Sequence, residues 1–508
     1  MSFKNKLIKL PYYRTNLIVA IDSTFGISKN NIIPWKIKED MNFFQDVTRR
    51  TYVPDEQNVV IMGKSTWKAL PDSYRGLRDR INIVVSSSMT TNELNTDNKT
   101  KTESYLVKSL SDAFGLCDTL QPGKVFIGGG SQIYKDVLEN YSIDEIYITH
   151  INKNYECDNL FPIDAYNKVI NNYKIHSSHE FKVNDENSKE NSKENITVKF
   201  TKFYRDQLPS QFNQNPEESQ YVNLMDQIIR TGDFRKTRNA NTWSVFGKTL
   251  EYDLANGFPI LTTKRVFFRG IFEELMFFLK GDTNTKILSD KNVKIWEPNT
   301  TREFLDSVGL QKYEQYDMGP MYGYQWRHFN VPYEGMNADY ANKGFDQINY
   351  CLNLLKTDPY SRRIIMTTFN PAQAKEGCLY PCHSIVLQWY VEKNNRLSLN
   401  CYNRSQDYIC GNPFNMSMAA LLIHLFCEVL NNDHTTKFLP GRLIMNLGDT
   451  HIYEDHYSEG IRQILRDPYE FPQLIFKRKV KDIGDFTYDD VVLANYVSYP
   501  NLNVKMVA

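Results

Sequence analysis

The chain has 508 residues, enough for two or three domains of about 100–200 residues each. Hydrophobic residues make up 41% of it and aromatic residues 13%, a composition that excludes an intrinsically disordered protein. Its 60 basic and 60 acidic residues cancel. Charge therefore gives no reason to expect nucleic acid or an anionic membrane as the main partner.

Neither the first residues nor the apolar patches predict export or membrane insertion. Residues 1–16 lack the apolar stretch of a secretory signal, and the patch at 418–426 is far shorter than the about 20 residues of a membrane span. The eight cysteines are scattered and form no C-x-x-C pair, which is typical of reduced thiols. We therefore expect a cytoplasmic protein without a membrane partner.

The first part of the chain alternates apolar runs with helical patterns. Because strands and helices alternate, we expect an α/β domain whose central, mainly parallel sheet is flanked by helices. The predicted strands lie at 16–22, 57–63, 80–86 and 124–130, and helical patterns lie at 39–44 and 64–70.

A charged, repetitive tract at 185–195 looks like a linker, but its flanks argue against that interpretation. Residues 173–183 and 196–205 both alternate as strands do. Two such strands around a polar tract predict a hairpin with a long solvated loop. We therefore place the interdomain linker further along, at 206–219.

This linker separates a first domain, residues 1–205, from a second, residues 220–508. The second domain opens with an amphipathic helix that is expected to end near Gly232. A helix with a strongly apolar face is expected to end at Gly281. Further along, two strands are joined by an Asn–Asn turn, and the two domains share no internal repeat.

Two strand-to-helix turns in the first domain are candidate phosphate sites. At 125–134 a strand, three glycines and a helix start follow one another, so the backbone can approach a phosphate closely. At 62–67 Lys64 and the hydroxyls of Ser65 and Thr66 stand at a similar turn. The upstream glycine of a full P-loop is missing there, so nucleotide hydrolysis is not expected. Either segment can also be an ordinary tight turn.

Asp40 lies on a predicted helix among Met41, Phe43 and Phe44. A carboxylate in such a place is usually a solvated residue on the face of a helix. It can also be a buried acid that binds a protonated heterocycle through two hydrogen bonds. The residue alone does not decide between the two.

Seven segments, in order, resemble dihydrofolate reductase over residues 14–205. They are Ile18–Ala20, the loop Gly26–Trp35, Asp40, Gly63–Trp67, Arg80–Asn82, Gly129–Tyr134, and Thr149 ahead of Phe161–Pro162. Within the loop, Ser28, Asn31 and Ile32 stand where the family usually has Gly, Gly and Asp. Ser87 stands where an arginine often contacts the cofactor's extra phosphate, which leaves Lys64 as the main cation.

The resemblance implies a folate site and an NADPH site. Asp40 is expected to bind the pteridine ring and help deliver its proton, with Thr149 behind it, and Arg80 to pair with the glutamate-tail carboxylate. The expected folate-binding residues are Ile18, Val19, Asp40, Met41, Phe44, Leu77, Arg80 and Thr149. The expected NADPH-binding residues are Ala20, Gly26, Ile27, Gly63, Lys64, Ser65, Thr66, Ser86, Ser87, Gly128, Gly129, Gly130, Ser131, Gln132 and Tyr134. The Gly129–Gly130 peptide bond is expected to be cis.

Cys382 precedes an apolar strand and allows three interpretations. A free cysteine is most often a small buried hydrophobe. A zinc site with Cys378 and His383 lacks a fourth ligand at a sensible spacing, so we expect no metal. The arginines of 361–365 and 401–407 favour a nucleophile, because guanidinium groups lower the pKa of a nearby thiol and bind phosphate. They can also belong to a solvated loop.

Nine segments resemble thymidylate synthase across residues 220–508, and imply a larger, mixed α+β domain. They are 258–265, 273–284, 295–299, 319–329, 358–364, 381–383, 403–407, 411–415 and 448–453. The resemblance makes Cys382 the nucleophile that adds to the pyrimidine of dUMP. Glu274 is expected to order water for proton transfers, and Tyr322 to assist removal of the ring proton.

The same resemblance implies two sets of ligand contacts. The expected dUMP-binding residues are Arg238, Arg362, Arg363, His383, Asn403, Arg404, Ser405, Asp407, Asn415, His451 and Tyr453. The expected contacts of the cosubstrate, 5,10-methylenetetrahydrofolate, are Ile295, Trp296, Asn299, Asp407, Gly411, Phe414 and Met506. This cosubstrate supplies both carbon and hydride, and it leaves dihydrofolate for the first domain to reduce with NADPH.

The leading hypothesis is therefore an enzyme with two active sites. In the synthase family a pair like Arg362–Arg363 crosses a dimer interface, so we expect a homodimer through the second domain. One alternative is a folate- or nucleotide-binding scaffold with only one active catalytic site. Another is an RNA-binding regulator, which the balanced charge disfavours.

Overall fold

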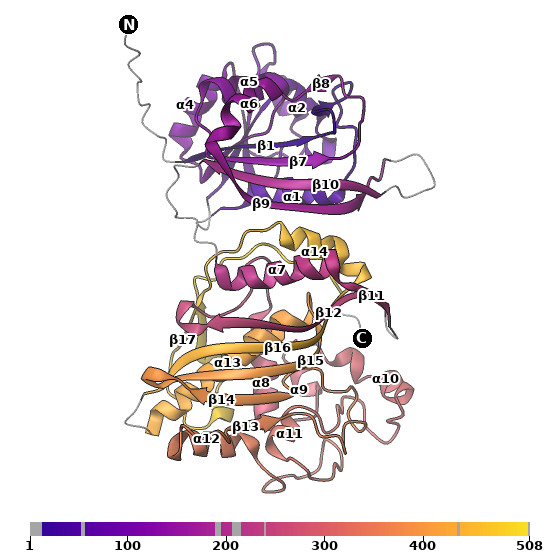
Figure 1. Ribbon diagram of the computed structural model, residues 1–508, viewed down its shortest axis with the longest axis vertical. Helices are drawn as coiled ribbons and strands as arrows, with labels where there is room; N and C mark the ends of the chain where they lie inside the picture. The colour runs from indigo at the N-terminus through magenta and orange to yellow at the C-terminus, as the bar shows by residue number, and fades with distance from the viewer. Residues whose placement is uncertain are drawn as a thin grey trace. The chain divides into compact units, whose positions relative to one another are not determined.

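The computed structural model of the chain divides into two compact units, Met1–Phe212 and Asn213–Ala508 (Figure 1). It describes residues 13–51, 56–187, 195–205, 215–237, 240–433 and 437–505. Of the linker expected at 206–219, residues 206–214 lie outside the described residues. Pro216–Ser219 form the first turn of a helix, so regular structure begins before Gln220.

The first unit is built on an eight-stranded sheet with the order β5-β4-β3-β6-β1-β7-β10-β9. Neighbouring strands from β5 to β7 run parallel, and β10 pairs antiparallel with β7 and with β9. The central strands are continuous apolar runs because both faces of the sheet are covered. The expected mainly parallel sheet is confirmed. The strands are β1 (Arg14–Ile21), β3 (Asn58–Gly63), β4 (Arg80–Val85), β5 (Ser104–Val107), β6 (Lys124–Ile127), β7 (Glu145–Ile151), β9 (Tyr173–Asn184) and β10 (Asn195–Arg205), with β2 (Gly26–Ser28) and β8 (Asn159–Leu160) pairing separately.

Helices α3 and α4 of this unit begin with capping boxes, in which Thr90 pairs with Glu93 and Ser109 with Asp112. Helices α2 and α5 begin instead at Gly63 and Gly130, and neither has a side-chain N-cap among the described residues. The helices are α1 (Lys38–Arg49), α2 (Lys64–Ala69), α3 (Thr91–Asp97), α4 (Leu110–Leu120), α5 (Ser131–Asn140) and α6 (Ile163–Val169), with 3-10 turns η1 (Asp72–Tyr74) and η2 (Ile170–Asn172).

Strands β9 and β10 form the predicted hairpin, paired to its ends at Asn184 and Asn195. Residues 188–194 of the charged tract lie outside the described residues. The start of the tract is not solvated as expected, because the Asp185 carboxylate accepts hydrogen bonds from Lys36 N at 3.0 Å and from the Tyr155 hydroxyl at 2.7 Å. The hairpin end is therefore attached to the segment that leads into α1.

The second unit is built on a six-stranded sheet with the order β11-β12-β16-β15-β14-β13. Strands β15 and β16 are parallel, and the other neighbours are antiparallel. Asn394 and Asn395 join β14 to β15 at φ values of 59° and 57°, which asparagine tolerates, so the predicted Asn–Asn turn is confirmed. The strands are β11 (Asp233–Lys236), β12 (Asn241–Asp253), β13 (Ile365–Thr367), β14 (Val386–Val391), β15 (Arg396–Asp407) and β16 (Leu439–Tyr453), and β17 (Gln473–Phe476) pairs with β18 (Val491–Ala494).

The predicted helix ends at Gly232 and Gly281 are both confirmed. Helix α7 starts behind the N-cap Asn215 and ends at Gly232. Helix α8 ends at Gly281, which has a φ of 76°, but it is buried almost all round rather than along one apolar face. The helices are α7 (Pro216–Thr231), α8 (Phe268–Lys280), α9 (Lys286–Ser289), α10 (Arg302–Ser307), α11 (Gly323–Arg327), α12 (Gln347–Thr357), α13 (Gly411–Asp433) and α14 (Tyr457–Ile464), with 3-10 turns η3 (Leu254–Asn256), η4 (Glu297–Asn299), η5 (Lys393–Asn395), η6 (Glu454–His456), η7 (Ile483–Asp485) and η8 (Tyr488–Asp490).

Helix α13 is the longest helix of the described chain. By length and composition its segment Gly411–Asn432, with a mean hydropathy of 1.5, could cross a membrane. However, 78% of this segment is buried inside the protein. It packs on β15, β16 and α8, and Figure 1 shows α8 and α13 behind the sheet. Its apolar character is therefore that of a core helix.

Two candidate active sites

The residues expected to bind NADPH follow the carboxyl ends of β1, β3, β4 and β6. Parallel strands end there at one edge of the sheet, the usual ligand position in an open α/β sheet. Gly63 N donates to Gly129 O at 2.7 Å, and Gly128 N to Ile61 O at 2.9 Å. The two candidate phosphate turns therefore lie side by side. Lys64, with its ammonium 3.3 Å from Ser88 Oγ, belongs to this edge.

The glycine turn before α5 has the shape of an anion site. The Gly129–Gly130 peptide bond is cis, as the resemblance implied. A Cβ atom on Gly129, whose φ is 102°, would lie 2.9 Å from the ring of Tyr134, so a larger residue does not fit. Among the described residues α5 has no side-chain N-cap, so its first N–H groups can receive a phosphate.

Asp40 lies in the first turn of α1 and is half-buried. Burial raises the pKa of its carboxyl to about 6, although the Thr149 hydroxyl and the Trp35 indole favour the charged form. Thr149, on β7, is itself buried. The surroundings thus favour the buried-acid interpretation over a solvated helix face. An accessible acid with this pKa suits proton delivery near neutral pH.

Arg80 is a buried cation, 4% exposed, at the start of β4. Its guanidinium donates to Thr48 Oγ1 at 2.6 Å and to Arg78 O at 3.0 Å, and no carboxylate pairs with it among the described residues. Burial, with the nearby charge of Arg49, lowers its pKa to about 9. A buried guanidinium without a counter-ion is suited to an incoming carboxylate.

The loop from Asp22 to Trp35 is attached at both ends through residues that the sequence did not reveal. Asp22 Oδ1 accepts from Gly26 N at 2.7 Å, and Asp22 Oδ2 from Tyr155 N at 3.0 Å. The Tyr155 ring lies 5.3 Å from the Trp35 ring, and its hydroxyl donates to Asp185. Tyr155 therefore connects the loop to the β9–β10 hairpin. Such single residues, far apart in sequence, leave no periodic signal.

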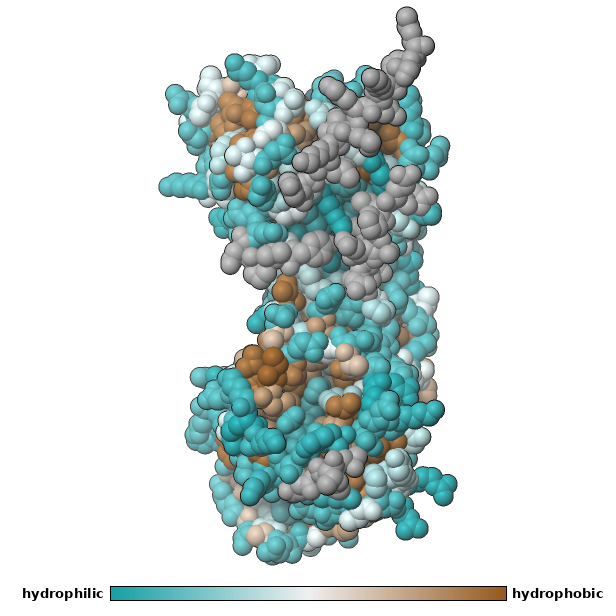
Figure 2. Space-filling view, turned by 90° about the vertical axis from the view of Figure 1, so that its left-hand side faces the viewer, coloured by the Kyte–Doolittle hydropathy of each residue, from teal (hydrophilic) through white to brown (hydrophobic). Residues whose placement is uncertain are grey.

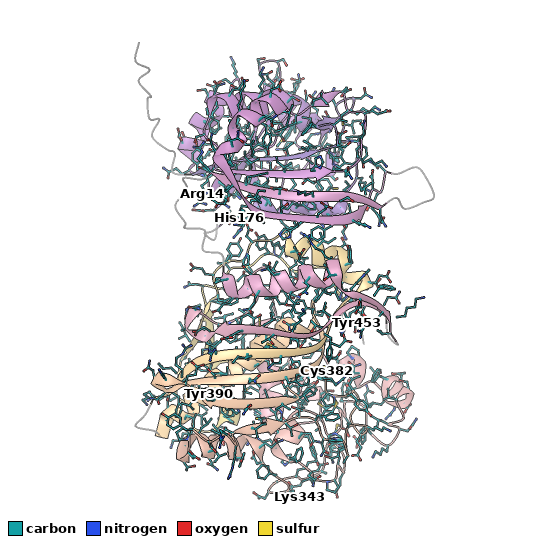
Figure 3. The ribbon with its side chains drawn as sticks, viewed as in Figure 1. Arg14, His176, Lys343, Cys382, Tyr390 and Tyr453 are labelled. Atoms are coloured by element: carbon teal, nitrogen blue, oxygen red, sulfur yellow. The ribbon has the colours of Figure 1, made fainter. Side chains whose placement is uncertain are left out.

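Cys382 of the second unit lies between Tyr322 and strand β15. Its Sγ is 3.5 Å from the Tyr322 hydroxyl, and its carbonyl accepts from Arg404 N at 2.8 Å and from Ser405 N at 3.2 Å. Burial raises the pKa of the thiol, while the Tyr322 hydrogen bond and the Arg404 charge favour the thiolate. Figure 3 shows Cys382 and Tyr453 at the same end of the sheet. Cys382 is thus half-buried and next to a cation, not a structural thiol in an apolar core.

A buried acid on α8 is connected to this thiol through two aromatic side chains. Glu274 on α8 is 6% exposed, and its Oε1 accepts from Trp296 Nε1 at 2.7 Å. Burial raises the pKa of Glu274 to about 7, although that hydrogen bond lowers it. The Trp296 ring meets Tyr322 edge-on at 5.9 Å. Glu274, Trp296, Tyr322 and Cys382 therefore form one continuous group.

Tyr322 is fixed by two stacked rings, Phe278 and His383, which also contact each other at 6.4 Å. Its ring stacks on Phe278 with centroids 4.8 Å apart and on His383 at 4.5 Å. His383 is buried, and desolvation lowers its pKa to about 3, so its ring is neutral. These ring contacts fix the position of the Tyr322 hydroxyl relative to Cys382. Phe278 was not recognised from the sequence, where it looks like any other apolar residue of α8.

Of the described arginines expected to bind the dUMP phosphate, only Arg404 contacts the Cys382 segment. Arg404 is exposed on β15, with Nε 3.2 Å from Pro381 O. Arg362 and Arg363 are also exposed, and neither bonds to the Cys382 group within the described chain. Asn403 is fully buried, where it accepts from Ser384 N at 2.8 Å and donates to Gln406 at 2.7 Å. Arg238 lies outside the described residues.

The remaining dUMP candidates lie at the end of β16 and nearby. Asp407 is the register partner of His451 in the parallel pair β15–β16. The His451 and Tyr453 rings are 5.2 Å apart, and His451 Nδ1 is 3.1 Å from Asp449 Oδ1. Asn415, on α13, is 9% exposed. Their spacing leaves a polar surface next to Cys382.

A pocket of about 480 Å³ lies beside the start of α13. It contains Phe414, one of the expected cosubstrate contacts, and carries both basic and apolar groups. Trp296 and Asn299, also expected there, are buried at η4, and Met506 lies outside the described residues. The pocket is lined by Lys264, Arg265, Val266, Phe267, Phe268, Arg269, Phe414, Tyr488, Asn501 and Leu502.

The segment before this pocket is supported by Glu218, which the sequence did not reveal. Glu218, in the first turn of α7, is fully buried. Its carboxylate accepts from Thr262 N at 2.9 Å, from the Thr262 hydroxyl at 2.6 Å and from Thr263 N at 2.8 Å. Thr262 O in turn accepts from Tyr499 N at 2.8 Å. One acid therefore fixes the residues just ahead of Lys264.

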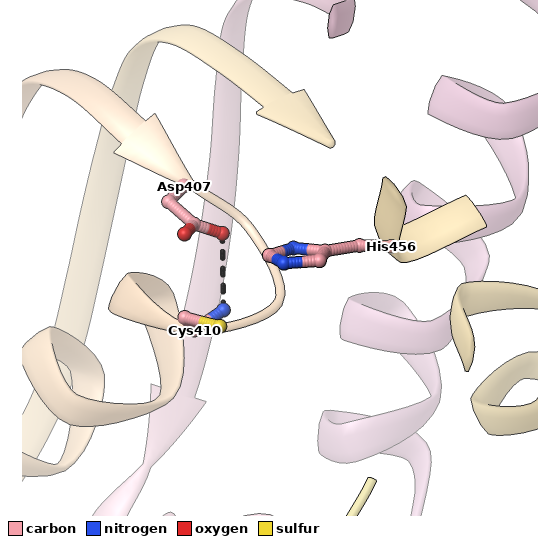
Figure 4. A group of neighbouring side chains, drawn as sticks. All are labelled: Asp407, Cys410 and His456. Atoms are coloured by element: carbon pink, nitrogen blue, oxygen red, sulfur yellow. Dashed lines mark hydrogen bonds between the residues drawn. The ribbon is translucent and has the colours of Figure 1, made fainter. Parts of the chain in front are cut away.

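Asp407 also takes part in a second group, with Cys410 and His456 (Figure 4). Its Oδ1 accepts from Ile409 N at 3.1 Å and from Cys410 N at 3.0 Å. His456 Nε2 is 2.8 Å from Lys505 O. Asp407 and Cys410 share one turn, but His456 comes from a distant segment, so its place beside them could not be predicted from spacing.

Comparison with known families agrees with this division of the chain. Residues 14–204 match the family model of dihydrofolate reductase, and residues 219–508 match that of thymidylate synthase. The two sites therefore define an enzyme of folate metabolism with two catalytic units, one for hydride transfer from NADPH and one for methylation of a nucleotide.

Relatives match both units together. Bifunctional dihydrofolate reductase–thymidylate synthases from Zea mays, Paramecium tetraurelia and Leishmania major are 36%, 35% and 35% identical to this chain. The matches cover 98%, 97% and 97% of this chain, and 97%, 98% and 94% of the relatives. The chain belongs to this bifunctional family. It methylates dUMP to dTMP with 5,10-methylenetetrahydrofolate and reduces the resulting dihydrofolate to tetrahydrofolate with NADPH.

Proposed function

We propose that Cys382 is the synthase nucleophile and that Glu274 and Tyr322 move the protons of that reaction. The observation that carries this proposal is the continuous group from Cys382 Sγ through Tyr322 to Trp296 and Glu274. Because burial raises the thiol pKa, the resting thiol is largely protonated. The Arg404 charge and the Tyr322 hydrogen bond favour the thiolate, which adds to the pyrimidine. Glu274, with a pKa of about 7, can both take and give a proton at neutral pH.

We propose that Asp40 and Arg80 orient dihydrofolate in the reductase site. Asp40 binds the pteridine ring, and its raised pKa supports delivery of a proton to the substrate. Arg80 lacks a carboxylate partner among the described residues, which supports its pairing with the glutamate tail. The other expected contacts of this site are Ile18, Val19, Met41, Phe44, Leu77 and Thr149, and the turns at Gly63 and Gly129 carry the NADPH contacts.

We further propose a homodimer formed through the free face of the β12–β16 sheet. Helices α8 and α13 cover one face of this sheet. On the other face, side chains of β14 and β15 alternate between buried and exposed. Tyr390 of β14 is 67% exposed on this face, and Figure 3 shows it at the end of the sheet away from Cys382. Tyr402 of β15 is 39% exposed on the same face, and aromatic residues are enriched at protein interfaces.

In this dimer Arg362 and Arg363 act on the partner's nucleotide. Both are exposed, and neither reaches the Cys382 group of its own chain within the described residues. A two-fold interface uses one patch twice, so each chain gives its arginines and receives those of its partner. The phosphate of dUMP would then be bound by Arg404 from one chain and by the arginine pair from the other.

Mixed dimers test this arrangement. Cys382→Ser chains should be inactive as synthase, and Arg362→Ala chains strongly impaired because a charged phosphate contact is lost. Equal amounts, dissociated and re-associated at random, should recover roughly a quarter of wild-type synthase sites, since half of the dimers are mixed and each has one intact site. If mixed dimers are verified by mass and no activity returns, Arg362 serves its own chain.

We also propose a cytoplasmic location without a membrane or nucleic acid as main partner. All eight cysteines are free thiols in the described chain. This state fits a reducing compartment. In the space-filling view hydrophilic side chains dominate, and hydrophobic ones gather in limited patches (Figure 2). Fractionation of cells that express the chain, with immunodetection of both units, checks the location.

A further inference from the structure

Asp407, Cys410 and His456 bring three different metal-binding atoms together beside the proposed folate contacts. Asp407 ends β15, Cys410 lies in the turn before α13, and His456 ends η6. Their carboxylate oxygen, thiol sulfur and ring nitrogen all lie within 4.8 Å of one another (Figure 4). The sequence alone suggests only Cys378, Cys382 and His383 as candidate metal ligands.

The hydrogen bond of His456 prepares its other nitrogen as a ligand. Lys505 O can only accept, so Nε2 carries the proton of the neutral ring and Nδ1 keeps a lone pair. His456 is 3% exposed, and its Nδ1 has no hydrogen-bond partner among the described residues. Metal-binding histidines commonly donate their second N–H to a backbone carbonyl in the same way.

The turn from Asp407 to Cys410 presents the other two ligands. Asp407 Oδ1 is occupied by the N–H groups of Ile409 and Cys410, which fixes the turn and brings the carboxylate close to the thiol. Both side chains are half-buried, so an ion can reach them from solvent. Cys410 directly precedes the 23-residue helix α13, but burial and the Asp407 carboxylate raise the pKa of its thiol to about 12, so an incoming cation must displace the thiol proton.

We propose that Asp407, Cys410 and His456 bind Zn²⁺ or a similar thiophilic divalent cation, and that the bound ion inhibits the synthase by excluding 5,10-methylenetetrahydrofolate. The second half of this proposal rests on the proposed role of Asp407 in folate binding. A carboxylate, a thiolate and an imidazole are the ligand types that zinc prefers, and three protein ligands leave a fourth position for water.

The geometry sets limits on the affinity. Tetrahedral zinc ligands with bonds of about 2.0–2.3 Å lie about 3.5 Å apart, so these side chains must close by about 1 Å. Binding forms a zinc–sulfur bond and releases the thiol proton to solvent. Lys264, which donates to Ile409 O at 2.5 Å, adds a nearby positive charge that opposes the cation. We therefore expect reversible inhibition, not a permanently loaded structural site.

Cobalt absorption tests the binding, independently of any activity. Metal-free full-length protein titrated with Co²⁺ should gain a thiolate-to-cobalt charge-transfer band that saturates at one ion per chain. Cys410→Ser should lose most of the band. Cys382→Ser, which removes the other accessible thiol of this region, should keep it. Loss of the band in Cys382→Ser and its retention in Cys410→Ser would place the ion on the catalytic thiol and overturn the proposal.

Zinc inhibition tests the consequence for the synthase. Zn²⁺ should inhibit dTMP formation competitively with 5,10-methylenetetrahydrofolate, while dihydrofolate reduction by the same chain stays unchanged. Relative to each variant's own uninhibited rate, Cys410→Ser and His456→Gln should need at least about tenfold more Zn²⁺, the effect of losing one zinc contact. Glutamine can still donate to Lys505 O, so His456→Gln removes the ligand nitrogen but keeps the hydrogen bond to that carbonyl. Equal inhibition of both variants and wild type refutes the site. If excess cosubstrate does not relieve the inhibition, the zinc site does not overlap the folate site. That result would not bear on the proposed role of Cys382.

Discussion

Asp40 and Glu274 are the acids proposed to handle protons in the two units, and their surroundings differ. Asp40 lies in the first turn of α1, half-buried, with its pKa raised to about 6. Glu274 lies inside α8, 6% exposed, with one indole donor and a pKa raised to about 7. Desolvation raises both pKa values. The reductase acid nevertheless stays within reach of a ligand, whereas the synthase acid is enclosed by protein.

The largest expected effects separate the two units. Cys382→Ser should lower dTMP formation by at least about 10,000-fold, as removal of a covalent nucleophile does, and leave dihydrofolate reduction within about twofold. Asp40→Asn should lower reduction by about 100- to 10,000-fold and spare the synthase. Both rates are measured on the same preparation, so each activity verifies the folding of the other unit. Substantial synthase activity in Cys382→Ser would refute the nucleophile.

The pH dependence of the reductase sharpens the comparison. A carboxyl with a pKa of about 6 holds its proton below that pH and loses it above. The rate of hydride transfer should therefore fall about tenfold for each pH unit above about 6, wherever protonation of the substrate limits the step. Single-turnover NADPH oxidation across this range measures it. Asp40→Asn should be slow but nearly independent of pH, and an unchanged slope in that variant would assign the proton to another group.

Glu274→Gln should remove the desolvation cost that the folded protein bears when Glu274 ionises. The folded pKa of about 7 lies above the ordinary glutamate value of 4.5, so the folded state binds more protons in this window. The contribution of Glu274 to wild-type stability is then greatest below pH 4.5, falls as the pH rises through 7 and levels off above it. Glutamine does not titrate, and it can still accept from Trp296. The variant should therefore lose activity but gain about 3 kcal/mol over wild type above pH 7, from about 2.5 pKa units at about 1.4 kcal/mol each, and nothing at low pH.

Calorimetry of the synthase transition at constant protein concentration measures this gain. Glu273→Gln is a matched control on the same helix, because Glu273 pairs with Lys291 at 2.6 Å. It should lose stability through the broken ion pair. A Glu274→Gln protein that is less stable than wild type at pH 8 would show that Glu274 is not desolvated in the way its burial indicates.

The smallest effects concern the β9–β10 hairpin. Replacing only 188–194 with a short Gly–Ser connection should leave reduction within about twofold, because exposed loop tips tolerate such changes. Extending the replacement to include Asp185 removes its bonds to Lys36 N and Tyr155, and should lower kcat about three- to tenfold, the effect of about 1 kcal/mol in hydrogen bonding. Asp185→Ala alone should reproduce most of that loss. Equal rates in all three proteins would mean that the hairpin does not position the loop before α1.

Regular periodic elements could be predicted from the sequence, and isolated contacts could not. The strands ending at Gly63 and Ile127, the helix ends at Gly232 and Gly281 and the Asn394–Asn395 turn follow from local patterns. Motif resemblance supplied Asp40, Glu274 and Cys382. Local sequence patterns do not identify residues whose contacts lie far away along the chain.

Asp185, Phe278 and Glu218 illustrate that limit. Each looks ordinary in its segment: a charged tract, an apolar helix and a polar first turn. Their partners Tyr155, Tyr322 and Thr262 lie far away along the chain and meet them only after folding. The error about the solvated start of the charged tract has the same cause, because the loop that binds Asp185 cannot be inferred from the tract itself.

The position of Glu218 has a consequence for dividing this chain into separate proteins. A synthase fragment that starts at Gln220 lacks the Asn215 cap and Glu218, and leaves Thr262 N, Thr263 N and the Thr262 hydroxyl without their acceptor. Those groups are buried directly ahead of Lys264, which lines the 480 Å³ pocket. A fragment that starts at or before Asn215 keeps them satisfied. The last residues of the linker expected at 206–219 are thus structural parts of the synthase. A truncation or gene fission that keeps synthase activity must therefore fall before Asn215.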